Sequence, residues 1–163
     1  MPKAKPAKRA ARLAPAMVTY ALSIDAWRPE YAIWIAGKEA WDGRPHHEFA
    51  TIELSTTALH PPKLKGQPAI VHLQGDRDLA HRLASPVART GIDHEPLGVA
   101  VLNWREGRGQ LLWSPPFDAL PMITQWLSIG RIKYLIGHGE ALRYGRAMLR
   151  SIRLSDVLDE DEL

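Results

Sequence analysis

The chain has 163 residues, of which 45% are hydrophobic and 24% are charged. These are the values of an ordinary globular protein that is long enough to bury a core. It contains no cysteine, which excludes disulfides and thiolate chemistry and fits a cytoplasmic location. No apolar run reaches the roughly 18 residues of a membrane-spanning helix, so we expect a soluble protein that does not bind a membrane.

Charge is distributed unevenly along the chain, whose net charge is +3. Residues 1–16 carry bases and no acid, and their prolines forbid a continuous helix, which predicts a disordered basic arm. Residues 156–163 carry acids and no base, which predicts a disordered acidic tail. Residues 17–155 are then expected to form a single globular domain. The basic arm either keeps the protein soluble or binds a nucleic acid or an acidic partner.

The first half of the domain shows the two-residue periodicity of strands. Apolar and polar residues alternate from Val18 to Asp25, which predicts a half-buried strand. We expect Arg28-Pro29 to turn the chain. Residues 31–37 and 48–54 are then expected to pair as a hairpin around a polar tip.

The middle of the chain continues with short strands and turns. Residues 61–66 form a turn cluster, residues 69–73 a strand, and residues 76–83 a short helix, followed by a loop at 85–96. Residues 97–104 are apolar on both faces, which predicts a central strand covered on both sides. We expect Arg105 to Arg108 to form a hairpin tip and residues 109–114 to form the returning strand.

The strongest helix signal covers residues 118–129. Asp118 is a candidate N-cap, and Gly130 is suited to the left-handed conformation that ends a helix. An apolar stripe predicts the buried side of this helix: Leu120, Ile123, Trp126 and Leu127. We therefore predict a mainly β fold, bordering on α+β. It would be a curved antiparallel sheet, a β-sandwich or an open barrel, with this one main helix packed on a sheet face.

Residues 131–136 predict another strand, but residues 141–154 fit two structures. As a helix, they align four arginines in a basic face, which would make nucleic-acid binding the leading function. As strands, they pair back on residues 132–136 through a turn at 137–140, with Gly145 at a bulge. A helix would pay about 1 kcal/mol for Gly145, and the two glycines of the link suit a hairpin, so we predict strands. The arginines are then scattered over a sheet face and serve solubility.

The histidines invite a metal site, and the chain holds seven of them. His46 and His47 are adjacent, and adjacent side chains of a strand point to opposite faces, so they cannot easily hold one ion. His138 lies between two glycines, in what we expect to be a tight turn. The sequence contains no serine-hydrolase, P-loop or dinucleotide motif. We therefore expect no metal, no cofactor and no catalytic residue, and the balance is against an enzyme.

Tryptophan is abundant, with six residues against two phenylalanines. Trp34 and Trp126 are expected in the core. The other indoles lie near strand ends, where they either pack or stack on sugars or bases. Together with nearby cations, they supply the candidate binding residues: Trp41, Trp104, Trp113, Arg108, Arg143, Arg146 and Arg150.

Three functions remain open from the sequence. The first is a non-enzymatic binding or interaction module that binds another protein or a second copy of itself. The second is a nucleic-acid-binding protein that uses the basic arm, Lys63, Lys65 and the C-terminal arginines. The third is a ligand carrier or enzyme with its pocket inside the curved sheet. The absence of a catalytic motif places the interaction module first.

Overall fold

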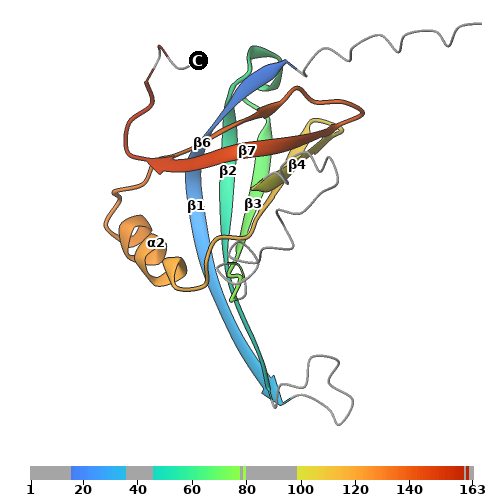
Figure 1. Ribbon diagram of the computed structural model, residues 1–163. Helices are drawn as coiled ribbons and strands as arrows, with labels where there is room; N and C mark the ends of the chain where they lie inside the picture. The colour runs from blue at the N-terminus through green and yellow to red at the C-terminus, as the bar shows by residue number, and fades with distance from the viewer. Residues whose placement is uncertain (1–15, 36–45, 78, 80–98, 160, 162–163) are drawn as a thin grey trace, which may run out of the picture.

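The computed structural model describes residues 16–35, 46–77, 79, 99–159 and 161 (Figure 1). Their elements, in chain order, are β1 (Met17–Ile35), β2 (His46–His60), the short helix η1 (Pro62–Leu64), β3 (Pro68–Gln74), β4 (Ala100–Arg105), β5 (Arg108–Trp113), α2 (Ala119–Ser128), β6 (Tyr134–Glu140) and β7 (Arg146–Ser155). Several predictions lie outside these residues: the basic arm, the polar tip at 38–45, most of the helix at 76–83 and the loop at 85–96.

The strands close a barrel in the order β1-β2-β3-β5-β4-β7-β6. This confirms a mainly β fold with a curved sheet and one main helix, and the sheet closes on itself instead of dividing into a sandwich. Neighbouring strands are antiparallel except β3 and β5, which run parallel. The parallel pair arises because β4 and β5 form a hairpin whose second strand lies beside β3.

The core is the interior of the barrel. On β3 the buried and exposed positions alternate, with Ala69, Val71 and Leu73 facing inward. The largest fully buried side chains come from all around the wall and include Tyr20, Leu22, Ile52, Leu54, Leu102, Leu111, Leu135 and Leu149. The prediction that the strand at 97–104 is covered on both faces is wrong for its described part, where only alternate residues are buried. A single-walled barrel has one dry face, so the other face of β4 meets solvent.

Strand β1 runs straight through Arg28-Pro29, so the predicted turn there is wrong. Arg28 pairs with Glu53 and Pro29 with Ile52, and the ladder continues to Ile35. A proline fits here because β6 pairs with β1 only as far as Ser23, and an edge strand does not need the missing N–H. From Tyr31 to Ile35, β1 pairs only with residues 46–50 of β2, which lie beyond the part of β2 that pairs with β3, and the two strands form a ribbon that extends away from the barrel (Figure 1). The predicted hairpin of residues 31–37 and 48–54 is confirmed in its described part, but with a shifted register: residues 31–35 pair with 46–50, and residues 51–54 pair with 27–30.

Helix α2 confirms the predicted helix and buries Leu120, Ile123 and Leu127. Asp118 stands at the predicted N-cap position, but the predicted capping bond is wrong: its dihedrals are already helical and its carboxylate makes no such bond. Gly130 does end the helix, at φ +67°. Its N–H donates to the Leu127 carbonyl at 3.1 Å, and the N–H of Arg131 donates to that of Trp126 at 2.9 Å, as in a Schellman motif. No helix in the described part of the chain has the length and apolar character needed to cross a membrane.

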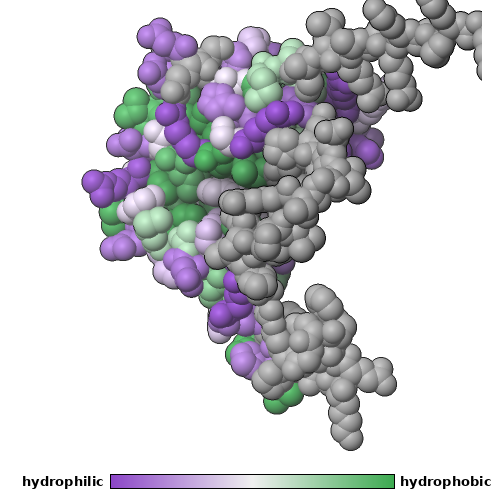
Figure 2. Space-filling model, in the orientation of Figure 1, coloured by the Kyte–Doolittle hydropathy of each residue, from purple (hydrophilic) through white to green (hydrophobic). Residues whose placement is uncertain are grey.

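Trp126 is only half-buried, which corrects the prediction that it lies fully in the core. Its neighbours around a shallow hollow are Arg131, Ile132 and Leu154. Figure 2 shows apolar side chains gathered in this region between α2 and β7. The indole therefore covers the rim of the core, whereas Leu127 on the same helix enters it.

Residues 146–155 form strand β7, which confirms the strand alternative for this segment. The predicted turn at 137–140 is wrong, because those residues belong to β6 and the chain reverses at Arg143 to Arg146 instead. Gly145 lies in that turn, and the bulge falls between His138 and Gly139. The glycines of β6 serve close packing, since a Cβ on Gly139 would collide with the Met148 carbonyl of β7.

Candidate functional site

Two hairpin tips of the same construction lie at one end of the barrel. In the β4–β5 tip, Glu106 and Gly107 have φ +51° and +74°; in the β6–β7 tip, Tyr144 and Gly145 have φ +51° and +77°. Positive φ at both central residues is the type I′ turn, whose twist matches that of the strands it joins. Each tip is therefore a short, rigid extension of the barrel wall.

The two tips lie side by side. The Trp104 N–H donates to the Gly145 carbonyl at 2.7 Å, and Asn103 is in register with Arg146. A Cβ added to Gly145 would lie 2.6 Å from the Trp104 carbonyl oxygen and 3.4 Å from Cγ of Arg105. The hairpins that carry the two tips are distant in sequence, and this contact brings their arginines to one place.

The turn around η1 belongs to the same end of the barrel. Gln67 accepts a hydrogen bond from Nε1 of Trp104 at 2.6 Å, and β3 starts beside β5, with Ala69 in register with Gly109. Strand β1 also starts here, because Met17 pairs with Glu140 at the end of β6. The segment that carries the five bases of residues 1–15 is therefore attached at this end.

This hairpin end is strongly basic. Its described cations come from three turns: Lys63, Lys65, Arg105, Arg108, Arg143 and Arg146. Its described acids are Glu106 on the β4–β5 tip and Glu140 on β6, and Glu140 is already paired with Arg150 at 3.5 Å. Cations held close together on a rigid wall attract a ligand that carries closely spaced negative charges.

The predicted binding residues are only partly brought together. Arg108, Arg143 and Arg146 meet at the hairpin end. Arg150 lies farther along β7, exposed and paired with Glu140. Trp41 lies outside the described residues.

The other two indoles belong to the wall of the barrel. Trp104 is 7% exposed and lies directly behind the tips, where its ring packs over Gly109. Its burial makes it a support for the tips and not a platform open to solvent. Trp113 is half-buried at the opposite end of β5, in register with Ala100.

Sequence reasoning did not identify Arg105 or Tyr144. Arg105 takes its place beside Arg143 and Arg146 only because β4 pairs with β7. Tyr144 precedes a glycine in a tip where Asn-Gly or Asp-Gly is the usual signal. The pattern Arg-Tyr-Gly-Arg is therefore a weak turn signal, although Gly145 within it is the residue that the turn requires.

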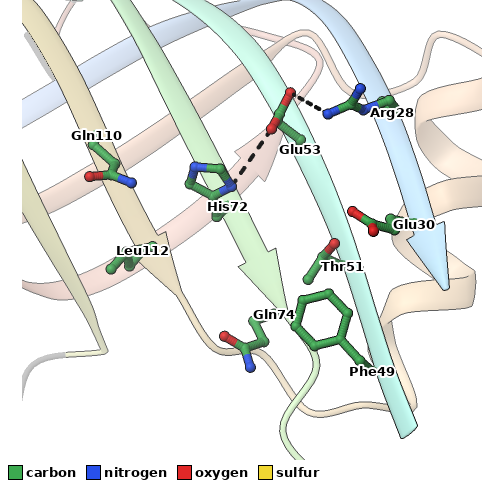
Figure 3. Close-up of a pocket in the computed structure, with 9 residues that line it drawn as sticks. All are labelled: Arg28, Glu30, Phe49, Thr51, Glu53, His72, Gln74, Gln110 and Leu112. Carbon is green, nitrogen blue, oxygen red and sulfur yellow. Dashed lines mark hydrogen bonds and ion pairs between the residues drawn. The ribbon is translucent and has the colours of Figure 1, made fainter. Parts of the chain in front are cut away.

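A second, polar surface lies on the outer wall of the barrel (Figure 3). Arg28, Glu53 and His72 lie in register on β1, β2 and β3. One Glu53 oxygen is 3.3 Å from Arg28 Nη2, and the other is 3.9 Å from His72 Nδ1. With the amides of Gln74 and Gln110 they line a shallow hollow of about 340 Å³. Because both oxygens of Glu53 already have partners, this hollow fits weak polar contacts better than a catalytic centre.

An apolar surface follows the ribbon of β1 and β2. Tyr31, Ile33 and Ile35 are exposed by 60%, 57% and 87% along one face of β1. At the base of the ribbon lies a groove of about 760 Å³. Its other side is formed by Phe117, which precedes α2, and by Leu120 of α2. Glu30 also lines this groove, and the Tyr31 hydroxyl donates a hydrogen bond to a Glu48 oxygen at 2.8 Å.

Side chains of the described strands fill the interior of the barrel. Large side chains from facing strands meet there, and barrels of about eight strands are just wide enough to be filled in this way. Among the described His, Asp and Glu side chains, no group of three or more is arranged to hold a metal ion. Comparisons with protein-family models, with curated proteins and with solved structures give no match, so no relative suggests a function for this barrel.

Proposed function

We propose that this protein is a non-enzymatic nucleic-acid-binding module that holds the phosphate backbone at the hairpin end of its barrel. The observation that supports this most directly is the contact between the two tips, which gathers Arg105, Arg108, Arg143 and Arg146. The sequence favours an interaction module because strands scatter arginines over a sheet. In the closed barrel, however, adjacent turns bring them together at one end.

The chemistry of these groups suits phosphate. A guanidinium is planar and always charged, and it donates paired hydrogen bonds that match phosphate oxygens. In the described part of the chain, none of the four tip arginines forms an ion pair, so their donors are open to a ligand. The backbone of the tips is already rigid, so little ordering is needed on binding.

Salt-dependent binding is the test, because each phosphate contact releases counterions. Fluorescence anisotropy of a labelled oligonucleotide would be measured over graded NaCl with the full-length protein. The variant Arg143→Gln/Arg146→Gln should bind roughly tenfold or more weakly, and its salt slope should fall by about 2.

The matched control removes two charges from the opposite end of the barrel. Arg131 and Lys133 are exposed there, so Arg131→Gln/Lys133→Gln lowers the net charge equally. We expect its affinity to stay within about twofold of the wild type. Equal losses in both variants would mean that binding follows net charge alone, and a wild type that binds nothing at low salt would refute the proposal.

A second candidate function is self-assembly through the ribbon. The apolar stripe of Tyr31, Ile33 and Ile35 lies on a part of β1 whose outer edge is unpaired among the described strands. Antiparallel pairing of two such edges would continue the sheet and bring two apolar stripes side by side. Sedimentation velocity should then show a dimer that Ile33→Lys converts to a monomer. A monomeric wild type at high concentration would exclude it.

A further inference from the structure

We infer that the ligand of the hairpin end is a single-stranded nucleic acid and that Tyr144 is the platform on which one of its bases stacks. This inference rests on the proposed function and names the form of nucleic acid that it concerns. Three properties of Tyr144 carry it: its exposure, its place in a rigid turn, and its position between two arginines.

The side chain of Tyr144 makes no packing contribution to the fold. Its exposure is 102%, as in an isolated extended peptide. The other strongly exposed tyrosine, Tyr31, at least donates its hydroxyl to Glu48 at 2.8 Å, whereas Tyr144 makes no side-chain hydrogen bond within the described part of the chain. A large aromatic ring held wholly in water has its full contact surface still available for a ligand.

The turn holds this ring in a defined place. Arg143 and Arg146 exchange backbone hydrogen bonds of 2.8 and 2.9 Å across the tip, and Tyr144 sits at φ +51°, where tyrosine is disfavoured. Glu106 has the same φ in the neighbouring tip, so the conformation alone does not mark a site. The two residues differ in what they expose. Glu106 exposes a charge, which water solvates well, whereas Tyr144 exposes an aromatic ring, which water solvates poorly.

The tip combines an aromatic ring with cations, and a single nucleic-acid strand combines bases with phosphates. Arg143 precedes Tyr144 and Arg146 follows it by two residues, and the two arginines pair across the turn, so the exposed ring belongs to the same tip as two phosphate-binding groups. Bases of a single strand can leave their neighbours and stack on an aromatic ring. The base faces of a duplex are already covered by adjacent pairs, so the ring would have no partner there. Stacking of this kind is sequence-tolerant, and its loss lowers affinity roughly 5- to 100-fold per base.

The test compares four oligonucleotides on the full-length protein over a series of NaCl concentrations. They are a fluorescein-labelled pyrimidine 12-mer, made as DNA and as RNA, its 12-base-pair duplex, and a 12-mer with abasic sites and the same phosphates. The wild type should bind the single strands more tightly than the duplex or the abasic strand. Tyr144→Asn should bind the intact single strands roughly 5- to 100-fold more weakly, with its salt slope and its binding to the duplex and abasic strand unchanged.

The variants separate stacking from folding and from charge. Asparagine is a preferred residue of this turn, so Tyr144→Asn should melt no lower than the wild type, and Tyr144→Phe should keep single-strand affinity within about twofold. Unchanged single-strand binding by Tyr144→Asn, or an equal loss on the abasic strand, would overturn the inference while leaving the proposed function standing. Arg143→Gln/Arg146→Gln should weaken the binding of all four oligonucleotides, and if it weakens the binding of none, the proposed function itself fails.

Discussion

The backbone N–H of Trp104 donates to the carbonyl oxygen of Gly145 across 2.7 Å. This bond joins the β4–β5 hairpin to the β6–β7 hairpin at their tips. It places a buried indole directly behind a turn that carries Arg143, Tyr144 and Arg146. The candidate binding surface thus depends on a contact in which neither side chain takes part.

Gly145 should therefore be more sensitive to substitution than its counterpart Gly107. Both have positive φ, +77° and +74°, so alanine costs about 1–2 kcal/mol of unfolding free energy at either. A Cβ at Gly107 meets nothing within 4 Å, whereas one at Gly145 lies 2.6 Å from the Trp104 carbonyl. We expect urea unfolding to show a larger loss for Gly145→Ala than for Gly107→Ala. Equal losses would mean that the two tips separate without cost.

Tyr20 should make the unfolding free energy fall at alkaline pH. Its hydroxyl donates to the Glu140 carbonyl at 2.8 Å, and burial raises its pKa, against the opposing effect of a backbone hydrogen bond from Leu142. The fold thus favours the protonated phenol, so this contribution is complete below the unfolded pKa of about 10 and is lost as pH rises through the folded value.

Tyr20→Phe tests this link. At neutral pH it should lose about 1–2 kcal/mol of unfolding free energy, because it removes both hydrogen bonds of the hydroxyl, to Glu140 and from Leu142. The wild type should lose this advantage progressively above about pH 10. Urea unfolding of both proteins between pH 8 and pH 11 checks it. A constant difference over that range would contradict the prediction.

Substitution of Leu127 by alanine should destabilise the protein more than substitution of Trp126, although tryptophan is the larger residue. Leu127 is buried and Trp126 is half-buried on the same helix. Leu127→Ala should therefore cost about 2–5 kcal/mol. Trp126→Ala should cost less, about 1–2 kcal/mol, because much of its indole surface is already in water. Thermal and urea unfolding would measure both, and a larger loss for Trp126→Ala would show that the indole is a core residue.

Deletion of residues 1–15 should affect binding more than folding. The arm has five bases and few large apolar residues, and β1 keeps its first contact through Ala16, whose carbonyl accepts from the Ala141 N–H at 3.1 Å. We expect the melting temperature to stay within about 4 °C. Oligonucleotide affinity should fall, with a shallower salt slope. A collapse of the melting temperature would mean that the arm packs on the barrel.

The local pattern of the sequence was enough to place most elements. Strict alternation identifies the strand that begins at Val18, and the β-branched run around Val71 identifies β3. The apolar stripe after Asp118 identifies α2. Gly107 marks the turn of the β4–β5 hairpin, and Gly130 marks the end of α2. Each of these features depends on the backbone preferences and side-chain spacing of neighbouring residues, which a single sequence displays directly.

Only the tertiary structure decided which elements meet. Pro29 looks like a turn residue, but it continues β1 because the edge of the strand is unpaired there. The glycines of β6 look like a turn, but they allow β7 to approach closely, and the turn falls at Tyr144. The arginines share one end of the barrel because β4 pairs with β7 and β5 with β3. Strand partners and barrel closure are set by contacts between distant segments, and local periodicity carries no information about which edges will pair.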